Sequence, residues 1–92
     1  MAVALYFDPP SKMTADQYDQ IMRDLEAAGA SSPEGRTYHA AFGDPSGLQV
    51  FDVWDSMEQF ERFGETLMPI LQRAGVDPGQ PHHADVRNVV TG

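Results

Sequence analysis

The sequence contains no cysteine, which excludes a disulfide framework and any thiolate chemistry. Basic residues are also scarce, with six Lys and Arg against fourteen Asp and Glu and a net charge of −8. Because nucleic acids and anionic membranes are bound through basic faces, we expect neither as a partner. The apolar start, Met1 to Phe7, lacks a basic flank and is too short for a signal peptide or a membrane span. We therefore expect a cytoplasmic protein.

The remaining composition is that of an ordinary globular chain. Of its 92 residues, 41% are hydrophobic and 22% are charged, which argues against disorder. This length predicts a single domain over residues 1–92. A chain of this size buries a modest core, so association with a second copy would add stability.

The first two expected elements are a strand over Ala2–Phe7 and a helix that begins after Thr14. Both faces of the strand are apolar, which is typical of a strand in the middle of a sheet. Thr14 can cap the helix with Gln17 at its third position, and Gly29 provides a natural end. Apolar residues repeat at steps of three and four along this helix and predict one stripe: Tyr18, Ile21, Met22, Leu25 and Ala28.

Three more strands are expected later in the chain. Arg36–Phe42 and Leu48–Trp54 alternate in polarity or are rich in β-branched and aromatic residues. The five residues Gly43–Gly47 between them have strong turn character and predict a hairpin. A final strand is expected over Ala84–Val90.

A second helix is expected from Met57, shortly after the end of the strand Leu48–Trp54. Ser56 offers an N-cap and Gln59 completes a capping box. Gly64 and Pro69 interrupt the helical pattern, since a proline inside a helix removes one hydrogen bond and clashes with the preceding turn. We expect a kink there, or a break into two short helices.

The resulting order, β-α-β-β-α-β, predicts a ferredoxin-like α+β fold with a four-stranded antiparallel sheet. Right-handed crossovers place the first and third strands in the centre and the second and fourth at the edges. Two helices cover only one face of such a sheet, yet the central strands are apolar on both faces. We therefore expect a homodimer in which two sheets face each other and form a barrel.

The run from Asp52 to Phe60, D-V-W-D-S-M-E-Q-F, is similar to the acidic-x-aromatic-x-Ser-x-Glu-x-Phe run of a known group. The chain resembles the dimeric α+β barrel superfamily, which includes antibiotic-biosynthesis monooxygenase-like domains. The cofactor-free members of the group form quinones from polycyclic phenols bound between sheet and helices, so the resemblance implies a pocket there and this kind of oxygenation. Haem-degrading relatives use an Asn, a Trp and a His whose positions fall here near Tyr6, on Phe63 and on Arg73. Haem degradation is therefore not expected.

His39 and Asp52 are the candidate catalytic residues, because they lie on adjacent antiparallel strands. A carboxylate beside an imidazole orients it and makes a general base near neutral pH. The alternative is a buried pair that only stabilises the sheet or the dimer interface. A five-residue hairpin would place His39 opposite Phe51, whereas a bulge or another register would bring it to Asp52.

Aromatic residues on the strands are the candidate ligand contacts. Tyr6, Tyr38 and Trp54, with Phe42 beside them, could line a pocket for a flat aromatic ligand. The alternative is ordinary packing in the core or at an interface. Trp54 and Tyr6 are preferred, because each has a polar atom that needs a partner when buried.

Polar residues near the C-terminus complete the candidates. Arg87 and Asn88 lie in the expected last strand, where one of them could bind an anionic or carbonyl oxygen or pair with Asp52. His82 and His83 point in opposite directions on an extended segment, so they cannot easily share a metal ion. No His-x-x-x-His motif or carboxylate triad accompanies them, so no metal is expected. No glycine-rich phosphate loop and no nucleophile elbow is present, so hydrolase, kinase and dinucleotide-binding functions are not expected, and no cofactor is expected.

These observations lead to a functional expectation with two branches. In one, a small dimer binds an aromatic or carbonyl-bearing metabolite and performs cofactor-free monooxygenation or isomerisation, with His39 or Asp52 as the base. In the other, the same residues only pack, and the protein is a non-catalytic binding or structural dimer.

Overall fold

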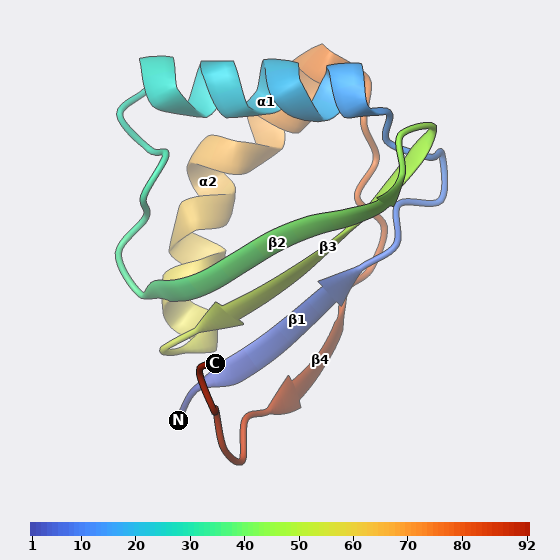
Figure 1. Cartoon of the computed structure of the whole chain (residues 1–92). Coiled ribbons are helices and arrows are strands. Elements are labelled where there is room, and N and C mark those ends of the chain that lie inside the picture. Colours follow the sequence, from blue (N-terminus) through green and yellow to red (C-terminus); the bar gives the residue numbers. More distant parts are fainter.

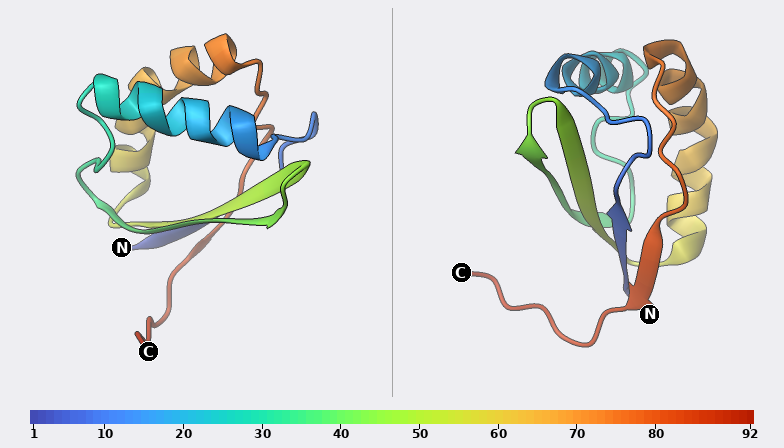
Figure 2. Two further views of the ribbon diagram at one scale, coloured as in Figure 1. Left: turned by 45° about the horizontal axis from the view of Figure 1, so that its top comes forward. Right: turned by 90° about the vertical axis from the view of Figure 1, so that its right-hand side faces the viewer.

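The computed structural model describes all residues from 1 to 92 and contains six regular elements (Figure 1). They are β1 (Val3–Phe7), α1 (Ala15–Ala27), β2 (Arg36–Asp44), β3 (Gly47–Trp54), α2 (Met57–Ala74) and β4 (His82–Asp85). The strands form one antiparallel sheet in the order β2-β3-β1-β4. Both helices lie on the same face of this sheet (Figure 2). The ferredoxin-like fold predicted from the sequence is confirmed. Neither α1 nor α2 has the length and apolarity that a membrane-spanning helix needs.

The helix ends follow the local sequence closely. Thr14 forms the predicted capping box with Gln17, whose backbone N–H donates to the threonine hydroxyl. Ser56 accepts from the backbone N–H of Gln59 at the start of α2, but the predicted capping box forms only by half, because the Gln59 side chain accepts from the Ser56 hydroxyl and not from its backbone N–H. Gly75 ends α2 in the left-handed region at φ 75°, which glycine adopts without steric strain. Contrary to one of the two expectations, α2 does not break at Pro69 and continues as a single helix whose axis bends (Figure 1).

The hairpin between β2 and β3 is tighter than expected. Asp44 pairs with Gly47, so only two residues form the connection, not the predicted five. The Asp44 carboxylate accepts from the backbone N–H and the hydroxyl of Ser46, and these bonds hold the pKa of Asp44 below its ordinary value. The shorter turn shifts the register by one residue. His39 therefore lies opposite Asp52.

The last strand differs from the prediction in both of its ends. It spans His82–Asp85, whereas the expected strand covered Ala84–Val90. Its only neighbour is β1, with Val3 opposite Asp85, and the final hydrogen bond runs from the Val86 N–H to the Ala2 carbonyl. Beyond that point β1 offers almost no further backbone, so the tail leaves the sheet (Figure 2).

The core lies between the helices and the inner face of the sheet. Trp54 is fully buried, and its indole contacts the rings of Phe60 and Phe63 at centroid distances of 5.5 and 5.4 Å. Aliphatic residues of α1, α2 and the loops form the other part of the core: Met13, Ile21, Leu25, Ile70, Leu71 and Val76. Asp52 is the only charged residue that is buried in this layer.

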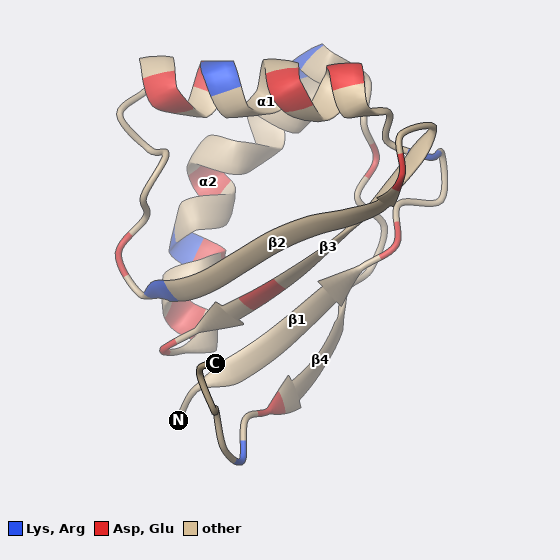
Figure 3. Cartoon of the chain, in the orientation of Figure 1, with Lys and Arg blue, Asp and Glu red and all other residues tan.

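The opposite face of the sheet has no helix over it (Figure 2). We call it the open face and define it by Ala4, Tyr6, Tyr38, Phe42 and Phe51. Tyr38 is 56% exposed and Phe42 is 43% exposed, although both are aromatic. Charged residues lie mostly on the helices and loops, and the middle of the sheet contains few of them (Figure 3).

Candidate functional site

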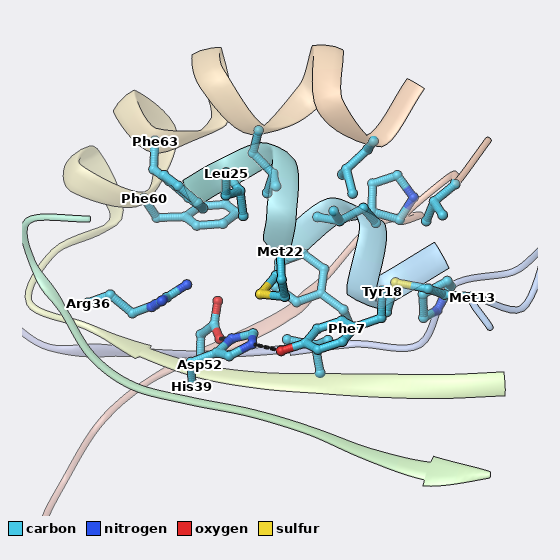
Figure 4. A pocket seen from close by; sticks show the side chains of 17 residues that line it. Phe7, Met13, Tyr18, Met22, Leu25, Arg36, His39, Asp52, Phe60 and Phe63 are labelled. Atoms are coloured by element: carbon cyan, nitrogen blue, oxygen red, sulfur yellow. Dashed lines mark hydrogen bonds and ion pairs between the residues drawn. The ribbon is translucent and has the colours of Figure 1, made fainter. Parts of the chain in front are cut away.

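A cavity lies between the sheet and both helices (Figure 4). Seventeen residues line it, twelve of them hydrophobic, and its volume is about 80 Å³. A dry apolar cavity of about 150 Å³ accepts benzene, so this one, at about half that volume, has to widen before it can hold a single ring. The titratable side chains that reach it are Tyr18, Arg36, His39 and Asp52. The site therefore combines an apolar wall with one concentrated polar cluster, which is the usual composition of a ligand pocket.

His39 and Asp52 meet at the floor of this cavity, from neighbouring strands. The Nδ1 atom of His39 lies 2.6 Å from Oδ1 of Asp52. The second carboxylate oxygen accepts from the indole N–H of Trp54 at 3.3 Å. Because a carboxylate only accepts hydrogen bonds, Nδ1 of His39 carries the proton and donates it. Nε2 of a neutral imidazole is then left as an acceptor that points away from Asp52.

Tyr18 occupies that acceptor from helix α1. Its hydroxyl oxygen lies 2.7 Å from Nε2 of His39, and its ring stacks parallel to the imidazole. The sequence predicts Tyr18 only as part of the apolar stripe of its helix. A signal was available, because a tyrosine hydroxyl that is buried needs a hydrogen-bond partner. The structure thus links Tyr18, His39, Asp52 and Trp54 in one hydrogen-bonded chain.

Burial raises the pKa of the Tyr18 phenol above its ordinary value of 10.0. The positive charge of Arg36 opposes this rise, while the negative charges of Asp52 and Asp19 add to it. Tyr18 is therefore protonated throughout the neutral range, and its hydroxyl donates to His39.

Alkaline titration should reveal this shifted tyrosine. We expect one phenol to ionise at a higher pH than free tyrosine, and Tyr18→Phe to remove that component of the ultraviolet phenolate signal. Because the folded chain keeps the Tyr18 proton more tightly than the unfolded chain, neutral Tyr18 contributes to the free energy of unfolding. This contribution is complete below pH 10.0 and is lost as the pH rises through the folded-state pKa. Urea unfolding across this range should show a steeper loss of stability in the wild type than in Tyr18→Phe. An unchanged titration in the variant would contradict the assignment.

Arg36 reaches the same cavity because β2 contains a bulge. The register shifts between Arg36 and Tyr38, so Arg36 pairs with Trp54 and its side chain lies on the inner side with His39. Regular alternation along β2 would put Arg36 on the same face as Tyr38. The guanidinium donates to the carbonyl of Ser31 at 3.0 Å and lies 5.9 Å from the centre of the Phe63 ring. Neither ion pair of the chain involves Arg36.

The other predicted ligand contacts lie elsewhere. Trp54 is buried behind Asp52 and does not line the cavity. Tyr6 and Tyr38 lie on the open face, where the Tyr6 hydroxyl donates to Gln49. Tyr6 pairs with Phe51 and Tyr38 pairs with Val53, and both of these β3 residues point to the face opposite to Trp54. The expected shared aromatic pocket therefore does not form.

Arg87 and Asn88 do not lie in a strand, since β4 ends at Asp85. They are exposed on the C-terminal tail and line a groove over the open face with Tyr38 and Phe51. This places them on the side of the sheet opposite to His39 and Asp52. Groups of three or more His, Asp or Glu side chains that could hold a metal ion are absent from the chain.

Comparison with known proteins shows similarity in structure only. No family model matches the sequence. No curated protein matches it either.

A candidate antibiotic biosynthesis monooxygenase from Chloroflexus aurantiacus superimposes with a TM-score of 0.69 at 18% identity, covering 99% of this chain and 98% of that one. For SnoaB, a cofactor-independent oxygenase from Streptomyces nogalater, the TM-score is 0.60 at 12% identity, with 99% and 96% covered. A candidate antibiotic biosynthesis monooxygenase from Caulobacter crescentus superimposes with a TM-score of 0.65 at 14% identity, covering 95% of this chain and 91% of that one. The chain thus has the α+β fold of the antibiotic biosynthesis monooxygenase structures over nearly its whole length.

Proposed function

We propose that this protein is a cofactor-free enzyme that ionises a small phenol or enolisable ring ketone in the cavity between sheet and helices. The observation that carries the proposal is the contact of 2.6 Å between His39 and Asp52, which lies in a cavity lined mostly by hydrophobic residues. The carboxylate orients the imidazole and stabilises the imidazolium that forms when a proton is accepted. The ionised substrate is then electron-rich.

Two reactions can follow such an ionisation. In oxygenation, a phenol and O₂ give a quinone and water, so that one oxygen atom enters the ring and the other leaves with the two hydrogens. In isomerisation, the proton returns to a different atom of the substrate. The shared fold with a cofactor-independent oxygenase favours the first. The volume of about 80 Å³ favours a single-ring substrate in either case.

The second candidate function is a non-catalytic binding module. It is favoured by the absence of any buried side-chain nitrogen or oxygen without a hydrogen-bond partner. A network that satisfies itself in this way is what a purely structural cluster also requires. Turnover, and not ligand binding alone, therefore has to separate the two functions.

The test is oxygen uptake and quinone formation with a panel of single-ring phenols and hydroquinones, without added cofactor. We expect His39→Ala to lower the rate by about 10²–10⁴-fold, which is the usual contribution of a general base. His83→Ala is the matched control, because His83 is exposed on β4 and should leave the rate unchanged. Equal rates in the wild type and His39→Ala would defeat the catalytic proposal. Saturable binding without turnover would support the binding module.

We also propose that the protein is a homodimer that buries the open face. The chain carries a net charge of −8, so two copies repel each other unless they meet through an uncharged surface. The open face is such a surface, since its defining residues are apolar or aromatic and two of them are strongly exposed. A second copy of the chain carries the same apolar face, so the two open faces can bury each other across a two-fold axis.

A further inference from the structure

We propose that Tyr18 is the residue that contacts the substrate, passing the substrate's hydroxyl proton to His39 while Arg36 holds the oxyanion that remains. This inference rests on the proposed function and narrows it to substrates with an acidic hydroxyl, either a phenol or an enol. It assigns the direct contact to a helix residue and makes His39 the final acceptor of the proton.

The geometry separates His39 from anything in the cavity. Nδ1 is bonded to Asp52 at 2.6 Å and Nε2 to the Tyr18 hydroxyl at 2.7 Å, so both ring nitrogens are occupied. A ligand reaches a free acceptor on His39 only by displacing Tyr18. The Tyr18 oxygen donates its single proton to Nε2 and keeps lone pairs that can accept another. Tyr18 is thus the accessible end of the hydrogen-bonded chain.

The proton transfer balances without a further reactant. The substrate O–H bond breaks, and its proton joins the Tyr18 oxygen as the proton of Tyr18 moves to Nε2 of His39. The electron pair stays on the substrate oxygen, and His39 becomes an imidazolium bound to the Asp52 carboxylate. The donor and the first acceptor are both hydroxyl oxygens, which exchange protons through a short hydrogen bond. A carbon-bound hydrogen does not form such a bond well, which is why the hydroxyl is the group that the site selects.

Arg36 supplies the charge that this product needs. Its guanidinium lines the cavity, is positioned by Ser31 and Phe63, and has no carboxylate partner. The charged groups that act on the relay of Tyr18 and His39 are Asp52 on β3, Arg36 on β2 and Asp19 on α1. Tyr18, His39, Arg36 and Asp52 are the titratable side chains that line the cavity. A positive charge beside a bound phenol lowers the phenol's pKa by about 1–3 units.

The test uses 4-nitrophenol, whose ionised form has its own visible absorbance. For the wild type we expect binding, with the pKa of the bound phenol lowered by about 1–3 units. Tyr18→Phe should keep the affinity at acidic pH, where the ligand is neutral, but raise the pKa of the bound phenol by at least about one unit, a tenfold change in its ionisation constant. The phenylalanine ring still covers Nε2 and only the oxygen is removed. Arg36→Met should reverse the shift, and Tyr38→Phe on the open face should change nothing.

The outcomes separate this inference from the function on which it rests. If bound nitrophenol ionises equally in the wild type and Tyr18→Phe, the relay is wrong, and His39 acts directly while the proposed function stands. If the wild type does not bind nitrophenol at all, the cavity does not take phenols, and both proposals fall. Circular dichroism of each variant confirms that the loss of ionisation is not a loss of folding.

Discussion

Replacing Trp54 with alanine is expected to lower the free energy of unfolding by about 3–5 kcal/mol, the range for truncation of a large aromatic residue in a core. Trp54 is fully buried, and its ring packs against the rings of Phe60 and Phe63. A small domain has about 5–15 kcal/mol of stability in total, so the variant should be close to unfolding at room temperature. Urea unfolding followed by far-ultraviolet circular dichroism measures the effect, because the variant lacks the only tryptophan of the chain.

Trp54→Phe is the matched control for this change. It keeps most of the apolar ring and removes the N–H that donates to Asp52 at 3.3 Å. We expect it to lower the free energy of unfolding by about 1–3 kcal/mol, less than the alanine variant. If the alanine variant lost no more than the phenylalanine variant, the indole would not be packed as the structure places it.

Phe42→Glu is expected to convert the proposed dimer into a monomer. An unpaired carboxylate in an apolar interface is destabilising by several kcal/mol per ion, which weakens dimerisation by about 100-fold or more. Light scattering coupled to size-exclusion chromatography should give the mass of two chains for the wild type at micromolar concentration and of one chain for the variant. The folded monomer should persist, since Phe42 is at the surface of β2.

Met68→Glu is the control for this experiment. Met68 lies on α2 and is 43% exposed, the same fraction as Phe42, but it is on the helical side of the molecule. The same charge introduced there should leave the dimer intact. A wild type of single-chain mass, or a Phe42→Glu variant that still dimerises, would contradict burial of the open face.

The candidate site was predictable in part. The residue types of His39 and Asp52 and their positions on adjacent strands were visible in the sequence. Their contact was not, because it depends on a hairpin of two residues where turn composition suggested five. One residue of register turns His39 from Phe51 to Asp52, and side-chain alternation makes such a shift decisive. Arg36 shows the same limit, since the bulge that turns it inward leaves no simple mark in the sequence.

Tyr18 illustrates a different limit. A helical stripe indicates which side chains face the core, but it does not say which strand residue each one meets. The partner of the Tyr18 hydroxyl is set by how α1 lies across β2, and His39 is twenty-one positions away in the chain. The last strand was misplaced for a related reason, since valine-rich residues can form a strand only where a neighbour provides backbone partners.

By itself the sequence determined the order of the elements, the helix caps, the central position of the apolar strands and hence the ferredoxin-like fold. These features depend on local propensity, on hydrophobic periodicity and on the handedness of crossovers, all of which are encoded in neighbouring residues. Tertiary structure alone decided the strand register, the separation of Tyr6 and Tyr38 from the cavity, and the chain from Tyr18 through His39 to Asp52. Those features depend on contacts between distant segments, and a shift of one residue or one helical turn changes them completely.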